Sequence, residues 1–199
     1  TLPGEPGPHR VEQASSHPHH CPFGPGGRMV AVPNKGLDRV FVFHLDTGTG
    51  RLVPAEPPFT TTRAGAGPRH LAFHPTRPTA WVVNELDSTI VTYRVGESGR
   101  LEPIHVTPSV PPTHTGDNTG SAIAAAPSGR FVYVSNRDSA SVCIIDGRIG
   151  AYVTHVGVGN LPFGVAASDG IRDVGRPEGG GGSQKTLAYF FHGVDDPFQ

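Results

Sequence analysis

Short apolar runs separated by Pro- and Gly-rich turns recur three times along the chain, in segments 19–46, 69–95 and 121–146. In each segment one apolar run leads into a turn that contains Pro25, Pro75 or Pro127, and a second apolar run leaves it. These prolines are 50 and 52 positions apart. Because apolar and polar residues alternate in short runs bounded by turn residues, each segment predicts an antiparallel hairpin followed by a third strand.

A repeat of this length with three or four short strands per unit is typical of a β-propeller, in which each unit is one blade. We therefore expect an all-β protein. The expected strands are 21–23, 29–32, 39–45, 71–73, 80–83, 89–94, 131–134 and 141–145. Linkers rich in Pro and Thr are expected at 55–68 and 107–119.

The repeat also divides the chain. Residues 1–16 are rich in Pro, Gly and Ser and are expected to form an irregular lead-in, and residues 17–156 are expected to form three propeller blades. Residues 157–199 then start a degenerate fourth blade, in which a Gly-rich insertion separates a first strand at 161–170 from a delayed second strand at 186–191. Three to four blades cannot close a ring, so we expect a fragment or truncated product whose open blade edges allow self-association.

Composition and charge argue against nucleic-acid and membrane partners. The 199 residues carry a formal net charge of −1, which leaves no basic footprint for nucleic acid. No apolar run approaches about 18 residues, and the first residues lack the features of a signal peptide, so no membrane association is expected. Cys21 and Cys143 lie in different repeats and form no disulfide framework, which favours a reduced, cytoplasmic protein.

Charged and polar residues fall at matching places in the repeats. Arg69 opens the first strand of the second hairpin, and Glu85 follows the second strand 16 positions later, so that the midpoint lies in the turn. Antiparallel pairing therefore predicts that these two side chains lie side by side at the open end of the hairpin. Two further pairs have the same spacing: His19 with Lys35, and Ser121 with Arg137. All six side chains are expected to emerge at one end of neighbouring blades.

Three segments carry a resemblance to a known family: HPHHCPFGPGGRMVAVPNKGLDRVFVF, AGPRHLAFHPTRPTAWVVNELDSTI and TGDNTGSAIAAAPSGRFVYVSNR. They resemble the lactonase family of seven-bladed β-propellers, whose members include a bacterial type of 6-phosphogluconolactonase and the fungal carboxy-cis,cis-muconate cyclase. The resemblance covers roughly residues 17–156, with three to four blades of the propeller present. It implies that the site residues of the family correspond to His19, Arg69, Glu85 and Arg137.

The resemblance implies a hydrolase that needs no metal or cofactor and opens a sugar lactone such as 6-phosphogluconolactone. His19 or Glu85 would be the general base, and the arginines would stabilise the oxyanion or hold a phosphate or carboxylate. Three further residues at this end are expected to bind the substrate: Lys35, Asn84 and Asn136. A simpler interpretation of the asparagines is that they are turn residues bonded to nearby backbone.

Two other functions stay open on the sequence alone: an isomerase of the muconate-cyclase type, and a non-catalytic propeller piece that serves as a binding scaffold. The Arg69–Glu85 pair has an alternative interpretation as a purely structural ion pair. The histidines near Cys21 lack a partner at ligand spacing, so no metal site is expected. The phrase SAIAAAP carries Ala122 and Ala124 where the family usually has an acidic residue and a His, so we expect weak activity or none from this chain.

Overall fold

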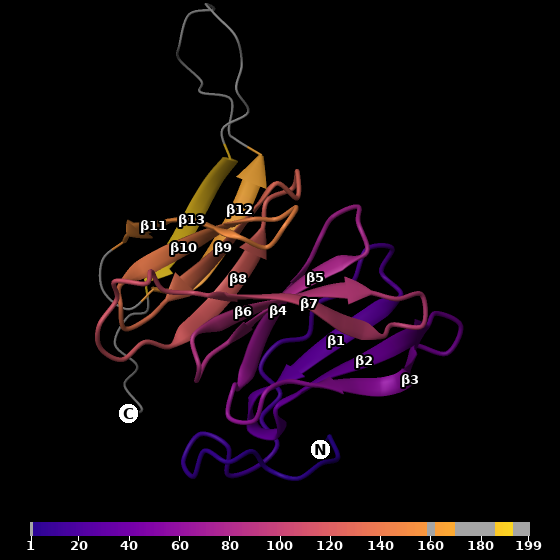
Figure 1. Ribbon diagram of the computed structural model, residues 1–199. Coiled ribbons are helices and arrows are strands. Elements are labelled where there is room, and N and C mark those ends of the chain that lie inside the picture. The colour runs from indigo at the N-terminus through magenta and orange to yellow at the C-terminus, as the bar shows by residue number, and fades with distance from the viewer. Residues whose placement is uncertain (1, 159–161, 170–185, 193–199) are drawn as a thin grey trace, which may run out of the picture.

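The computed structural model describes residues 2–158, 162–169 and 186–192, and these residues form antiparallel sheets (Figure 1). The first sheet has the order β1-β2-β3 and is built from β1 (Met29–Asn34), β2 (Arg39–Asp46) and β3 (Arg51–Thr61). One short 3-10 helix, η1 (Lys35–Leu37), lies between β1 and β2. No helix in the described part of the chain is long and apolar enough to cross a membrane.

Two four-stranded sheets follow in chain order. The second consists of β4 (Pro68–Phe73), β5 (Thr79–Asn84), β6 (Thr89–Val95) and β7 (Leu101–Pro108). The third consists of β8 (Gly120–Ala125), β9 (Phe131–Asn136), β10 (Ser141–Asp146) and β11 (Tyr152–Gly157). Figure 1 shows the three sheets one after another, from indigo through magenta to orange. The predicted all-β propeller architecture is confirmed, and each sheet is one blade.

A further pair of strands follows the third blade. β12 (Pro162–Asp169) pairs antiparallel with β13 (Thr186–His192), and β12 packs beside β8 and β9. This is the place at which the first two strands of a fourth blade are expected. The Gly-rich insertion that the sequence predicts between them lies outside the described residues.

The outermost strand of each blade was not predicted from the sequence. The prediction of a linker over 55–68 is wrong, because β3 continues to Thr61 and covers the first half of this range. Pro54, Pro57 and Pro58 interrupt the apolar alternation there and hide the strand signal. Proline is tolerated because β3 is the edge of its sheet, where a missing N–H leaves no inner partner unbonded. The outer strands β7 and β11 likewise lie where the sequence analysis predicts no strand.

The innermost segment of blade one is less regular than predicted. The expected strand 21–23 is replaced by an extended segment with two isolated bridges to β1, Pro18 with Asn34 and Phe23 with Val30. Backbone bonds support it, since the N–H of His19 donates to the carbonyl of Pro33 over 3.0 Å. Pro18 and Pro22 cannot donate to a ladder, which explains why no continuous strand forms.

The pairing register in each hairpin is shifted by one residue from the prediction. Pro68, not Arg69, pairs with Asn84, and the next pair is His70 with Val83. Arg69 is therefore the extra residue of a β-bulge. The same irregularity occurs in blade three, where Gly120 pairs with Asn136 before the register shifts. Arg69 consequently lies between the pairs Pro68–Asn84 and His70–Val83, and Glu85 follows directly after the first of these pairs.

The core fills the spaces between successive blades. β5 is buried on both faces, and Trp81, Val82 and Val83 are fully shielded from solvent. Val82 packs with Val42 of blade one, whereas Trp81 and Val83 pack in a cluster with Val132 of blade three. Each fully buried side chain of this size contributes about 1.5–3 kcal/mol, so the blades are held firmly against one another. This packing fixes the strand ends that carry the charged residues.

A left-handed residue recurs at the turn between the second and third strands of every blade. The three residues are Asp38, Ser88 and Ala140, with φ values of 51°, 53° and 48°. The carbonyl of each accepts a backbone N–H from just past the outermost strand of its own blade. The donors are Thr62, Ser109 and Val158, at 2.8, 2.8 and 2.9 Å. Ala140 has neither the side-chain oxygen nor the freedom of glycine that favours this conformation.

We expect Ala140→Gly to stabilise the protein by about 0.5–1 kcal/mol, because glycine adopts a left-handed conformation without the penalty of a Cβ. Urea unfolding of the full chain measures the change. Ala64→Gly is the matched control, because Ala64 is exposed and does not have a positive φ. The control should lose a little stability through the greater freedom of the unfolded chain. Equal losses in both variants would contradict this account.

Candidate functional site

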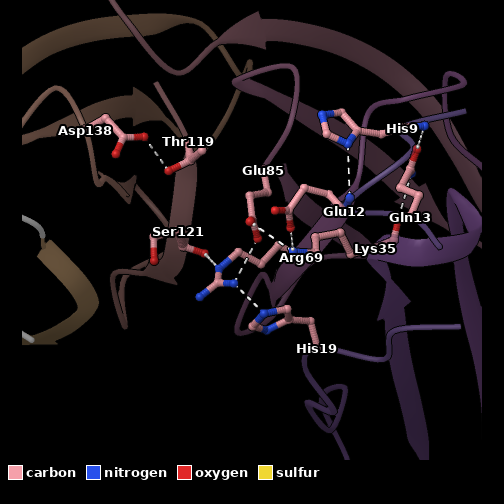
Figure 2. Close-up of polar contacts among 10 residues, drawn as sticks. All are labelled: His9, Glu12, Gln13, His19, Lys35, Arg69, Glu85, Thr119, Ser121 and Asp138. Atoms are coloured by element: carbon pink, nitrogen blue, oxygen red, sulfur yellow. Dashed lines mark hydrogen bonds and ion pairs between the residues drawn. The ribbon is translucent and has the colours of Figure 1, made fainter. Parts of the chain in front are cut away.

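A charged cluster lies at the end of the blades where the bulges occur (Figure 2). Glu85, which directly follows β5, forms ion pairs with two cations. Its Oε2 lies 2.9 Å from Nη1 of Arg69, and its Oε1 lies 3.1 Å from Nζ of Lys35. Lys35 directly follows β1, so the carboxylate joins blade one to blade two. Its side chain is 14% exposed, which leaves it little bulk water.

Arg69 links three blades. Its Nε donates to the carbonyl of Ser121 over 3.0 Å, and its Nη1 contacts Nε2 of His19 as well as Glu85. A guanidinium only donates, so Nε2 of His19 is the acceptor and the neutral ring carries its proton on Nδ1. Figure 2 shows these contacts converging on one guanidinium. Among the described residues, Nη2 of Arg69 has no hydrogen-bond partner, so its two N–H groups are available to a ligand.

The environment favours an uncharged imidazole at His19. Burial lowers the pKa of His19, and the neighbouring Arg69 charge lowers it further, although Glu85 opposes this. Burial also lowers the pKa of Arg69, the carboxylate of Glu85 opposes this, and the charge of Arg137 acts in the same direction as burial. His19 is therefore a neutral base at neutral pH.

Lys35 is held by residues that the sequence analysis places in an irregular lead-in. Its Nζ lies 2.7 Å from Oε2 of Glu12, and its side chain is only 6% exposed. The neighbouring Gln13 is fully buried, and its Nε2 donates to the Lys35 carbonyl and to Oδ1 of Asp38, both over 2.7 Å. Lys35 lowers the pKa of Glu12 through the hydrogen bond and its charge. Nothing in the apolar pattern distinguishes Glu12 or Gln13, so sequence reasoning missed both.

Arg137 lies beside this network without joining an ion pair among the described residues. Its guanidinium carbon sits 4.7 Å from the ring centre of Phe163, which belongs to β12. Its Nε is buried and has no partner within the described residues. Oγ of Ser121 donates to the Phe163 carbonyl over 3.0 Å. Arg137 therefore stands as an unneutralised cation, oriented by an aromatic ring, near Arg69.

The predicted substrate residues Asn84 and Asn136 are 1% and 0% exposed, respectively. Nδ2 of Asn136 donates to the Ser109 carbonyl over 2.6 Å, and its Oδ1 accepts from Asn118 over 3.1 Å. Nδ2 of Asn84 donates to Oγ1 of Thr89 over 2.9 Å. These bonds belong to the blades rather than to the charged cluster, so a role in substrate binding remains a prediction.

A row of histidines continues from His19. The rings of His20 and His70 stack with centres 4.4 Å apart, and Nδ1 of His20 accepts the N–H of Leu71 over 3.2 Å. Burial is the main reason that the pKa of His70 falls to about 3, and the neighbouring rings add to it. Within the described residues, no three His, Cys, Asp or Glu side chains are grouped so that they could hold a metal ion.

The cluster contains the two kinds of group that hydrolysis of an acyl group needs: a proton acceptor and donors that stabilise an oxyanion. A neutral imidazole can accept a proton from water, and the free N–H groups of Arg69 and Arg137 can stabilise an oxyanion or hold an anionic group. Lys35 and the two arginines outnumber the carboxylates of Glu12 and Glu85. The local charge therefore favours an anionic ligand.

The chain is similar to known proteins over most of its length. Residues 1–157 match the family described as "Lactonase, 7-bladed beta-propeller". The chain is similar to the 6-phosphogluconolactonase of Bacillus subtilis (strain 168), with 33% identity over 141 residues, covering 70% of this chain and 39% of the relative. It is also similar to the 6-phosphogluconolactonase of Yersinia pestis (strain Pestoides F), with 34% identity over 143 residues, covering 69% and 42% of the two chains.

Solved structures are also similar to this chain. The periplasmic gluconolactonase PpgL of Pseudomonas aeruginosa matches with a TM-score of 0.71 and 30% identity, over 77% of this chain and 45% of that one. A protein from Lactobacillus plantarum matches with a TM-score of 0.75 and 28% identity, over 83% and 48%. The chain thus spans less than half the length of these relatives. With a family match over most of its residues and three blades in its described part, the chain belongs to the lactonase family of seven-bladed β-propellers.

Proposed function

We propose that the charged cluster is the catalytic face of a lactonase-type hydrolase that opens a sugar lactone such as 6-phosphogluconolactone. One observation supports this more than any other. The Arg69 guanidinium touches His19 of blade one, Glu85 of its own blade and the Ser121 carbonyl of blade three, and it keeps N–H donors that no described residue takes up. Relatives that carry the name 6-phosphogluconolactonase support the choice of substrate class.

The proposed reaction begins when the lactone carbonyl oxygen accepts N–H groups of Arg69, including the one now bonded to His19. Nε2 of His19 then has a free lone pair and takes a proton from water as the water oxygen attacks the carbonyl carbon. The negative charge that develops on the carbonyl oxygen is stabilised by Arg69. When the tetrahedral intermediate collapses, the ring C–O bond breaks and the protonated imidazole returns its proton to the leaving oxygen.

Arg137 is proposed to hold the anionic end of the substrate. Its guanidinium lies over the Phe163 ring, which limits its rotation and presents its N–H groups in a fixed plane. A planar guanidinium binds a phosphate or carboxylate through two parallel hydrogen bonds. In this arrangement Glu85 is a positioning residue, because its carboxylate already pairs with Arg69 and Lys35.

That double pairing also favours a second candidate function, a scaffold that binds an anionic partner without turning it over. Both oxygens of Glu85 are already engaged, one by Lys35 and one by Arg69, so neither is free to accept a proton from water. Ala122 and Ala124 of β8 offer no replacement base. Binding without turnover is the outcome that would favour this alternative over hydrolysis.

The expected effect of Arg69→Ala is a fall of about 100- to 1000-fold in the rate of lactone opening, because one oxyanion donor is worth about that much. The full chain is assayed with 6-phosphogluconolactone, and the spontaneous rate is subtracted. Arg94→Ala is the matched control, since Arg94 is an exposed arginine of β6 paired with Glu102 at 3.2 Å. Arg94→Ala should leave the rate of lactone opening unchanged. A chain with no turnover above the spontaneous rate, or an Arg69→Ala variant as fast as the parent, contradicts the proposal.

The rate of lactone opening is expected to rise as His19 loses its proton. The pKa of His19 lies below its usual 6.5 because of burial and the charge of Arg69, and only the neutral ring accepts a proton. The rate should therefore rise with pH through a value below 6.5 and stay level at neutral pH. His19→Gln should lower the rate and remove this step from the pH–rate profile. A step at or above 6.5, or one that persists in His19→Gln, would exclude His19 as the base.

A further inference from the structure

We infer that His20 is a positioning residue that holds the proposed base His19 against Arg69, by tethering the innermost segment of blade one (residues 17–23) to blade two. This inference rests on the proposed lactonase function, because it assigns a support to the base of that reaction. The hydrogen bond of His20 goes to the backbone of Leu71 rather than to the charged cluster, so His20 acts through the placement of its neighbour.

The innermost segment of blade one has little support from its own blade. In blade two the corresponding strand, β4, pairs with β5 from Pro68 to Phe73. The segment of blade one has two isolated bridges to β1 instead, and the N–H of His19 donates to the carbonyl of Pro33 over 3.0 Å. These contacts hold the backbone of His19 in its own blade, whereas its ring meets Arg69 of the next blade. A second contact across the interface is therefore needed to fix the ring in place.

His20 supplies this contact on the strand that carries Arg69. Its Nδ1 accepts the N–H of Leu71 over 3.2 Å, and Leu71 follows Arg69 by two residues in β4. β4 is at the edge of its sheet, so the N–H groups that point away from β5 need partners outside the sheet. The ring of His20 also stacks on that of His70, with centres 4.4 Å apart and planes inclined by 22°. The bond and the stack fix residue 20, and one peptide unit joins it to residue 19.

The repeat shows that this bond is not a general feature of the blades. With an offset of 50 positions, His70 is the counterpart of His20 in blade two. With an offset of 52 positions, Ile123 of β8 is the counterpart of Leu71 in blade three. Among the described residues, the ring of His70 accepts no hydrogen bond from Ile123, and β4 is held by its own ladder. The tether thus occurs where the innermost segment lacks a ladder, which is also where the proposed base lies.

The protonation state of His20 suits this role. Burial lowers the pKa of His20, the hydrogen bond with Leu71 opposes this, and the charge of Arg69 acts in the same direction as burial. The ring is therefore neutral at neutral pH, and Nδ1 keeps the lone pair that accepts the N–H of Leu71. The charged and titratable groups around His19 that a displaced ring would leave are Arg69, Glu85, Lys35, His17 and His70.

The test compares His20→Ala with His20→Asn in the full chain. Asparagine keeps an acceptor, because its Oδ1 is as many bonds from the backbone as Nδ1 of histidine, whereas alanine has none. Without the tether the ring of His19 gains water and moves away from Arg69, so the two causes that lower its pKa weaken. We expect His20→Ala to raise the pKa of His19 toward 6.5 and to lower kcat for 6-phosphogluconolactone by about 10- to 100-fold, with KM little changed. His20→Asn should restore both values toward those of the parent.

The pKa is measured by NMR titration of the isotopically labelled chain, with the ring signals of His19 assigned from their loss in His19→Gln. His105→Ala is the matched control, since His105 is an exposed histidine of the outer strand β7, and it should change neither value. If His20→Ala fails to fold, His20→Phe takes its place, because phenylalanine keeps a ring for the stack and has no acceptor.

A pKa of His19 that stays at the parent value in His20→Ala would overturn the inference. A His20→Asn variant that behaves like His20→Ala would also overturn it, and so would a kcat that does not change when the pKa moves. Failure of the proposed function gives a different result. If the parent shows no turnover while the pKa of His19 rises in His20→Ala and returns in His20→Asn, the tether is established and the lactonase proposal is contradicted.

Discussion

The buried carboxylate of Asp38 is the interaction on which the arrangement of the site depends. Oδ1 accepts the N–H of Gly67 over 2.8 Å and Nε2 of Gln13 over 2.7 Å, and Oδ2 accepts the N–H of Gly65 over 2.7 Å. The positive φ values of the two glycines, 65° and 79°, belong to the loop that turns these N–H groups toward the carboxylate. Charge-assisted hydrogen bonds of this kind offset the cost of burying the charge.

Both ends of the Lys35–Glu85 ion pair are positioned through this carboxylate. Gln13 holds the Lys35 carbonyl while it bonds to Asp38, and the Gly67 carbonyl accepts the N–H of Glu85 over 2.8 Å. Asp38 therefore fixes the backbone on both sides of the contact between blade one and blade two. The ion pair therefore follows from the placement of the backbone on both sides of it.

The sequence predicted the repeat, the blades and the end of the hairpins at which charges gather, because turn residues and apolar alternation set these features locally. It did not predict the bulge at Arg69, since a one-residue register shift changes no residue type and leaves the periodicity intact. It also missed β3, whose prolines break the pattern of a strand without preventing an edge strand. The roles of Glu12 and Gln13 depend on contacts with residues more than 20 positions away, which no local pattern encodes.

The left-handed residues at Asp38, Ser88 and Ala140 close each blade within its own stretch of sequence, because their carbonyls bond to the end of the outermost strand of the same blade. The contacts of Arg69 with His19 and Ser121, by contrast, join residues 50 and 52 positions apart. Closing a longer loop costs more entropy, so these contacts between blades cost more chain ordering than the contacts within a blade. The charged cluster exists only where three successive blades are docked, and its geometry reports whether neighbouring blades have come together correctly.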